Sequence, residues 1–270
     1  MKVAVYQGPG IPLDVAANIE TLSVQAERAA HESARLLIAP EMILSGYNIG
    51  PQAISERAEA SDGASAQAIA DIARRHGIAI LYGYPERAAG HIYNSVQLIE
   101  RDGKRLANYR KTHLFGDIDR DAFSPGTEET VLADLDGWRI GFLICYDVEF
   151  PENVRRLALA GADFVAVPTA VMPPYDFVAT HMVPTRAFEN QVFVAYANRC
   201  ASENGLDYIG QSCIVGPDGK DLARAERDET LIFAHLERDL LDRWRSVNTY
   251  LADRRPALYG PLTETRGEAK

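Results

Sequence analysis

The chain has 270 residues, of which 47% are hydrophobic, so it has enough apolar side chains for a full core and is neither disordered nor fibrous. Acidic residues outnumber basic ones, 38 to 28, and the formal net charge of -10 argues against nucleic acid and membrane surfaces as partners. Three cysteines are an odd number and lack CxxC spacing, so we expect neither a disulfide framework nor a zinc site. We also expect no other metal and no cofactor.

Apolar periodicity predicts alternating strands and helices at the start of the chain. Residues 2–7 read as a strand, Asp14 as the cap of the helix that follows, and residues 36–39 as a second, buried strand. A helix over about 65–76 stops at Gly77 and leads into a strand over 78–82. This order is typical of βαβ units with parallel strands.

After this region the pattern changes to strand pairs joined at Asp-Gly dipeptides, which favour hairpin turns. These dipeptides lie at 102–103, 136–137 and 218–219. The other elements that we expect are a strand over 139–144, a helix over 151–160, a strand over 164–167, a helix over about 180–190, and strands over 193–198 and 231–235. Hairpins next to βαβ units imply mixed sheets.

The sequence shows no linker, repeat or low-complexity stretch, so we expect residues 1–270 to form a single domain. Its tail, about 241–270, carries Trp244, Tyr250 and Tyr259 among charges and is expected to be an arm that packs on something else. The chain opens directly on a strand without a signal peptide, and no apolar run approaches the ~18 residues of a membrane span. A cytoplasmic location is therefore expected.

Three polar residues stand at the ends of predicted strands, where α/β proteins usually place their sites. They are Glu41, Lys111 and Cys145. Each has an ordinary alternative: a surface acid, a lysine that protects a sheet edge, and an inert buried thiol. Together they suit acyl transfer, because a carboxylate can serve as the base and an ammonium can stabilise negative charge beside a thiol nucleophile.

A Cys-His pair is the competing design for such a nucleophile. Of the six histidines, only His113 lies beside a candidate residue. We expect it to line or brace the site rather than to act as the base.

Three segments in this order resemble the nitrilase superfamily, the Glu-Lys-Cys carbon–nitrogen hydrolases. They are residues 40–47 (PEMILSGY), 109–114 (YRKTHL) and 145–152 (CYDVEFPE). The resemblance implies an α/β fold, a four-layer αββα sandwich of two mixed sheets. It also implies homodimers or higher homo-oligomers, built through the helices after the cysteine and through the C-terminal arm.

The resemblance also assigns a role to each residue of the set. It makes Cys145 the nucleophile, Glu41 the general base and Lys111 the electrostatic stabiliser. Lys111 would hold the tetrahedral oxyanion together with the backbone N–H of Tyr146.

Many members of the superfamily carry a second glutamate shortly before a Phe-x-Pro-Gly segment. The segment here is residues 123–126, and the matching position is Asp119, whose side chain is one methylene shorter. We expect Asp119 to be the supporting carboxylate. Glu128 and Glu129, just after the segment, are the alternatives.

The residues after the nucleophile narrow the substrate. Nitrilases proper usually have Cys-Trp-Glu, whereas this chain has Cys-Tyr-Asp, and branches that bind a substrate carboxylate carry a basic residue where this chain has Val148 and Glu149. Because Glu149 would repel an anion, we expect a small neutral or cationic carboxamide, which is hydrolysed to the acid and ammonia through a thioester. The other residues expected to bind substrate are Tyr47, His113, Leu114, Phe115, Ala170, Val171 and Met172.

Other functions stay open at this point. A nitrilase or an N-carbamoyl amine amidohydrolase of the same superfamily would use the same three residues. A non-catalytic binding protein that kept the fold is the alternative from another class.

Overall fold

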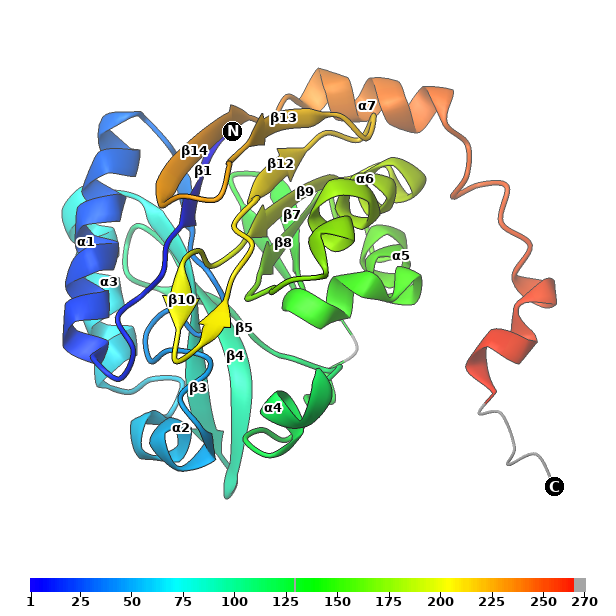
Figure 1. Ribbon diagram of the computed structural model, residues 1–270. Helices are drawn as coiled ribbons and strands as arrows, with labels where there is room; N and C mark the ends of the chain where they lie inside the picture. The colour runs from blue at the N-terminus through cyan, green and yellow to red at the C-terminus, as the bar shows by residue number, and fades with distance from the viewer. Residues whose placement is uncertain (129, 265–270) are drawn as a thin grey trace, which may run out of the picture.

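The structure, a computed structural model, describes residues 1–128 and 130–264. At its centre two six-stranded mixed sheets face each other (Figure 1). The spatial order of the first sheet is β14 (Thr230–His235), β1 (Lys2–Gln7), β2 (Leu36–Ile38), β3 (Ala79–Ala88), β4 (His91–Ile99) and β5 (Arg105–Arg110). That of the second is β13 (Asp221–Arg224), β12 (Cys213–Val215), β9 (Phe193–Ala197), β8 (Phe164–Pro168), β7 (Trp138–Phe142) and β6 (Leu132–Leu135).

Each sheet has three parallel strands at its centre, β1, β2 and β3 in the first and β7, β8 and β9 in the second. These strands are covered on both faces. In β1, Val3 and Val5 point into the core between the sheets, while Ala4 and Tyr6 belong to a second core under the helices. Burial on both faces explains why such strands read as continuous apolar runs rather than as alternating patterns.

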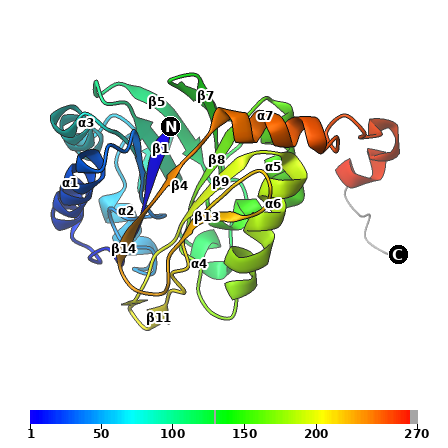
Figure 2. The same cartoon turned by 90° about the horizontal axis from the view of Figure 1, so that it is seen from above.

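Two layers of helices complete the sandwich (Figure 2). α1 (Val15–His31) and α3 (Ala64–His76) cover the first sheet, and α5 (Pro151–Leu159) and α6 (Val183–Asn190) cover the second. The predicted helix ends are present. Asp14 caps α1 by accepting a hydrogen bond from Ala17 N–H at 3.0 Å, and Gly77 ends α3 with φ 68°. The four-layer αββα sandwich is confirmed.

The Asp-Gly dipeptides also turn the chain as predicted, between β4 and β5, β6 and β7, and β12 and β13. At the second of these turns both Asp136 and Gly137 have positive φ, 51° and 77°. Two successive left-handed residues are what a type I′ turn requires.

Short elements at the strand ends escaped sequence reasoning, because a few residues cannot establish a period. The helix expected from about residue 180 also begins earlier, with a π-helical turn that runs straight into α6. The elements involved are α2 (Pro51–Arg57), α4 (Gly116–Arg120), the hairpin of β10 (Ser202–Glu203) and β11 (Leu206–Asp207), and the π turn Val178–Met182.

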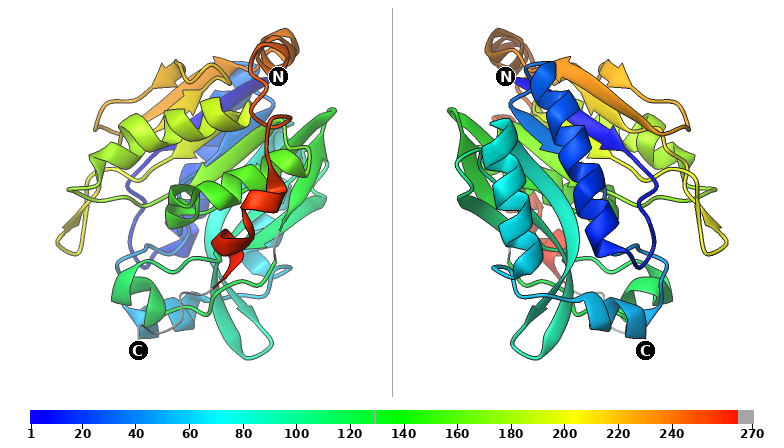
Figure 3. Two further views of the ribbon diagram at one scale, coloured as in Figure 1. Left: turned by 90° about the vertical axis from the view of Figure 1, so that its right-hand side faces the viewer. Right: turned by 90° about the vertical axis from the view of Figure 1, so that its left-hand side faces the viewer.

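The C-terminal region includes the predicted arm, about 241–270, whose first residues lie in a helix packed on the domain. It begins with α7 (Arg238–Val247), in which Leu241 is fully buried, and the rings of Trp244 and Tyr250 meet Phe188 of α6 at 6.1 and 6.0 Å. The arm proper is therefore shorter. It continues through the 3₁₀ turns Pro256–Leu258 and Gly260–Thr263 and passes the α5 and α6 layer (Figure 3). Residues 265–270 of the predicted arm lie outside the described part.

No helix among the described residues is both long enough and apolar enough to cross a membrane.

Candidate active site

The base and the cation of the predicted set come from one sheet. Glu41 lies three residues after β2 ends, and Lys111 directly follows β5. Both side chains are fully buried, and Lys111 Nζ donates to Glu41 Oε1 at 2.8 Å. The close approach of the Glu41 loop to β3 depends on Gly83, where a Cβ atom would lie 2.4 Å from the backbone nitrogen of Met42.

Asp119 completes this group although its side chain is short. The helix α4 brings it to Lys111, whose Nζ donates to Asp119 Oδ2 at 2.7 Å. Asp119 also accepts from the backbone N–H of Phe115 at 2.8 Å and from the Tyr47 hydroxyl at 3.0 Å. The rival position Glu128 pairs instead with Arg110 at 3.5 Å, and Glu129 lies outside the described residues.

The buried group holds one cation between two carboxylates, and this imbalance governs its titration. Burial raises the pKa of Glu41, and the charge of Lys111 only partly opposes this effect. Burial alone would lower the pKa of Lys111, but Glu41 and Asp119 outweigh it and hold that pKa well above its ordinary value. Lys111 therefore stays protonated, and Glu41 has a raised proton affinity that suits a general base.

Cys145 comes from the second sheet, on a sharp turn between β7 and α5. It opens the 3₁₀ turn Cys145–Glu149 and has φ 48°, a left-handed conformation that is unfavourable for a residue with a Cβ atom. Asp147 stabilises this turn by accepting from the backbone N–H of Ile144 at 3.0 Å. It also accepts from the Tyr109 hydroxyl at 2.9 Å, which ties the turn to the end of β5.

The environment of Cys145 keeps its thiol neutral at rest. Burial and then the neighbouring Glu41 carboxylate raise the pKa of this thiol, while Lys111 acts in the opposite direction. Glu41 uses Oε1 to accept from Lys111 and from Asn94, the latter at 2.6 Å. Its Oε2 is buried and has no hydrogen-bond partner among the described residues. That oxygen is available to take a proton.

The backbone beside the sulfur offers a donor. Tyr146 is the second residue of the 3₁₀ turn, where a backbone N–H has no acceptor within the helix. Such a donor and the Lys111 ammonium can together hold an oxyanion.

A small cavity of about 10 Å³ opens beside the sulfur. It has room for about one water molecule, so a substrate must displace side chains to enter. Its lining includes seven residues that the sequence indicated and one, Tyr175, that it did not: Tyr47, Phe115, Cys145, Glu149, Ala170, Val171, Met172 and Tyr175.

Two other predicted substrate-binding residues do not line this cavity. Leu114 packs in the apolar cluster around Met42 and Tyr47. His113 stacks on Phe150 with ring centroids 4.1 Å apart, and its backbone N–H donates to Asp147 at 2.9 Å. His113 therefore braces the turn that carries Cys145.

Sequence reasoning missed the supporting roles of Asn94 and Asp147. Asn94 lies within the predicted hairpin with no local signal, and only the pairing of β4 with β3 and β5 places it beside Glu41. Asp147 lies two residues after the cysteine, and this was an available signal, because an acidic side chain at the third position of a helical turn can accept from the backbone N–H of the capping residue. Among residues 1–128 and 130–264 no cluster of three or more His, Cys, Asp or Glu side chains could hold a metal ion.

Comparison with known proteins agrees with this geometry. The chain matches the sequence model of the carbon-nitrogen hydrolase family over residues 2–246. It belongs to that family. This carbon–nitrogen hydrolase is accordingly a hydrolase of non-peptide carbon–nitrogen bonds, and the predicted membership of the nitrilase superfamily is confirmed.

Three of its relatives match it along nearly their whole length. It is 58% identical to a protein of Pseudomonas protegens named "Hydrolase in pqqF 5'region", over 98% of this chain and 92% of the relative. An (R)-stereoselective amidase of Pseudomonas sp is 38% identical over 98% of this chain and 95% of its own. A double mutant of the amidase from Nesterenkonia sp. AN1, solved in complex with acrylamide, superposes with a TM-score of 0.87 at 32% identity and covers 97% of each chain.

Proposed function

We propose that this carbon–nitrogen hydrolase is an amidase, which hydrolyses a small neutral or cationic carboxamide to the carboxylic acid and ammonia. The observation that carries the proposal is the junction of the two sheets. There Glu41 and Lys111 form a buried ion pair, and their charges act on the pKa of Cys145, which stands on a turn with positive φ. Two solved or curated relatives are named amidases, which supports the same reaction class.

The geometry suggests an order of steps. Glu41 takes the thiol proton as Cys145 sulfur bonds to the amide carbon, and the oxyanion lies between Lys111 Nζ and the Tyr146 N–H. Glu41 passes the proton to the amide nitrogen, the C–N bond breaks and ammonia leaves a thioester. Water then attacks this thioester while Glu41 takes its proton, the C–S bond breaks, and the proton returns to the sulfur.

The cavity lining supports the choice of substrate. Its only carboxylate is Glu149, whose pKa is raised by burial, and it contains no arginine or lysine among the described residues. Lys111 lies outside this lining and is already paired with Glu41 and Asp119. A substrate carboxylate would therefore find no free cation in the cavity and one acid beside it. The Nesterenkonia amidase was solved with acrylamide, a small neutral amide.

Ammonia release from matched amides tests the proposal. Propionamide represents the neutral class, β-alaninamide the cationic class and succinamate the anionic class, with propionitrile as a test for nitrilase activity and N-carbamoylmethylamine for carbamoylase activity. We expect kcat/KM for the neutral and cationic amides to exceed that for succinamate by about 10-fold or more. Faster turnover of succinamate, of the nitrile or of the carbamoyl compound would reject the proposed substrate class.

Glu149→Gln is the matched variant for this assay, because it removes the charge and keeps the side-chain size. We expect this variant to reduce the ratio of kcat/KM for propionamide to kcat/KM for succinamate. An unchanged ratio would show that Glu149 does not select the substrate.

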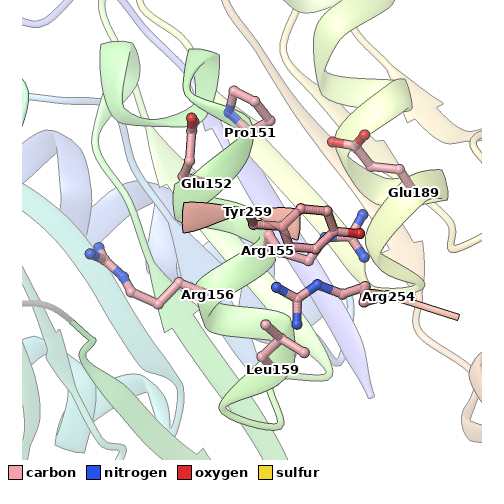
Figure 4. Close-up of a pocket in the computed structure, with 8 residues that line it drawn as sticks. All are labelled: Pro151, Glu152, Arg155, Arg156, Leu159, Glu189, Arg254 and Tyr259. Atoms are coloured by element: carbon pink, nitrogen blue, oxygen red, sulfur yellow. The ribbon is translucent and has the colours of Figure 1, made fainter. Parts of the chain in front are cut away.

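We further propose that two copies of the chain pair along α5 and the arm. Within one chain, a groove of about 530 Å³ lies between α5 and the arm (Figure 4). It is lined by Arg155 and the half-exposed Leu159 from α5, Glu189 from α6, and Arg254 and Tyr259 from the arm. Light scattering on the full chain and on a chain ending at Val247 tests this. A dimer that the truncation converts to monomer is expected, and a monomeric full chain would refute the pairing.

The cytoplasmic location stays a prediction.

A further inference from the structure

A buried ion pair, Arg199 with Glu203, lies behind the catalytic group rather than in it. Arg199 follows β9, and Glu203 belongs to β10. Arg199 Nη2 donates to Glu203 Oε1 at 2.8 Å, and the two side chains are 0% and 1% exposed. Neither residue lines the cavity beside Cys145, so neither is placed to touch a substrate.

The cation of the pair holds the start of the loop that carries the base. Arg199 Nη1 donates to the carbonyl oxygen of Met42 at 3.3 Å and to that of Glu41 at 3.5 Å. Met42 has φ 50°, which is unfavourable for a non-glycine residue, so the backbone here needs external support. Arg199 Nη2 also donates to the carbonyl of Pro9, which anchors the guanidinium to the segment after β1.

The anion holds the end of the same loop. Glu203 accepts from the backbone N–H of Tyr47 at 3.1 and 3.0 Å and from that of Asn48 at 2.6 Å. The Tyr208 hydroxyl donates to it at 2.6 Å. The ion pair thus clamps residues 41–48 at both ends.

The clamped loop closes a ring of contacts around the catalytic group. From Tyr47 the hydroxyl donates to Asp119, Asp119 accepts from Lys111, and Lys111 donates to Glu41. A shift of one end of the loop would therefore move the base relative to the cation. Displacements of about 1 Å in an active site can lower rates about 100-fold.

We propose that the Arg199–Glu203 ion pair is a positioning device, which sets the distance between Glu41 and Lys111 by clamping both ends of the loop 41–48. This inference rests on the proposed function, in which Glu41 is the base. A buried ion pair is in general weakly stabilising or even costly compared with apolar residues of the same volume, so its retention here is explained better by placement than by stability.

The test is the double variant Arg199→Met/Glu203→Gln, which removes both charges and keeps the volume, so that no unpaired charge is left buried. Its matched control is Arg35→Met/Glu100→Gln, because Arg35 and Glu100 form another largely buried ion pair, 2.6 Å long and 13% and 15% exposed, at the opposite end of β2. We expect kcat for propionamide to fall about 10- to 100-fold in the test variant, with KM within about threefold, and to stay within about twofold in the control. Equal kcat in the wild type and in a folded test variant would overturn the inference.

A second variant covers the case in which the double variant fails to fold. Arg199→Lys keeps the charge but has one ammonium in place of a planar fork, so it cannot bridge Glu203 and the loop carbonyls together. We expect kcat to fall about 5- to 10-fold with an unchanged KM. Full kcat in this variant would also overturn the inference.

A readout without turnover separates this inference from the proposed function. The rate of Cys145 alkylation by iodoacetamide, followed against pH by peptide mass, reports how Glu41 and Lys111 act on the sulfur. A changed pH profile in the test variant but not in the control supports the clamp even if the wild type hydrolyses no amide, a result that would reject the proposed function alone. Identical profiles would overturn the clamp.

Discussion

The two sheets contribute groups of opposite character to the proposed catalytic site. Glu41 and Lys111, on the first sheet, are charged groups buried among polar partners, which include Asp119 and Asn94. Cys145, on the second sheet, is a neutral thiol on a backbone turn with positive φ. On the first sheet, hydrogen bonds and ion pairs stabilise buried charges. On the second sheet, a tight turn fixes the position of a neutral side chain.

The difference follows from the cost of burial. A charge taken out of water must be paired, or the group becomes neutral or the structure unfolds. Burying a neutral thiol costs little free energy. A thiol that acts as a nucleophile must, however, point at the carbonyl carbon of the substrate and have a hydrogen-bond donor nearby to stabilise the oxyanion. Asp147 helps to fix the direction of the Cys145 side chain. It does so by stabilising the turn, through hydrogen bonds from the Ile144 N–H and the Tyr109 hydroxyl. Changes on the two sheets should consequently differ in their effect on stability.

The largest expected effect is that of Cys145→Ala on activity. Loss of the nucleophile should lower kcat at least about 10⁴-fold, because no covalent route remains. The melting temperature should change by only a few degrees, since the side chain is small and uncharged. Ammonia release and circular dichroism measure the two. Substantial residual turnover would place the nucleophile elsewhere.

Lys111→Met tests the first sheet, where we expect a loss of both activity and stability. It removes the charge that two buried carboxylates, Glu41 and Asp119, are paired with. We expect kcat to fall about 10³-fold and the free energy of unfolding to fall by about 3–5 kcal/mol. Without the cation the pKa of Glu41 rises further, so protons bind the folded state more tightly than the unfolded state. The variant should therefore lose stability, relative to the wild type, as pH rises.

Urea unfolding at several pH values measures this, with Cys145→Ala as the control. The same pH dependence in both variants would mean that Lys111 does not balance the carboxylates.

Asn94→Ala should have a smaller effect, which appears mainly in the pH profile. The amide of Asn94 donates to Glu41 Oε1 and favours its ionised form, so its loss raises the pKa of Glu41. A base must be unprotonated to act, and the acid limb of kcat/KM should move to higher pH, with about a 10-fold loss near neutrality. A profile that only scales, without moving, would exclude this electrostatic role.

The smallest effect is expected for Tyr47→Phe, which deletes one hydrogen bond to Asp119 and keeps the ring in the cavity wall. Asp119 retains Lys111 and the Phe115 N–H, so kcat should fall only a few-fold. A loss as large as that of Lys111→Met would show that the hydroxyl has a direct part in the reaction.

The sequence by itself determined the features that depend on neighbouring residues. Apolar runs located the central strands, Asp-Gly dipeptides located three hairpins, and the segments around Glu41, Lys111 and Cys145 indicated the family that the comparison confirmed. These signals are local, because side-chain periodicity and turn conformation are set within a few residues.

Only the tertiary structure decided which distant residues support these three. Asn94 reaches Glu41 across paired strands, and no local signal marked it. Asp119 was expected from its place before the Phe-x-Pro-Gly segment, and the structure decided only that its short side chain reaches Lys111. Arg199 and Glu203 are more than 150 positions from the loop that they hold. Such contacts depend on how two sheets stack and where short helices cross their ends, and no local pattern in the chain encodes that arrangement.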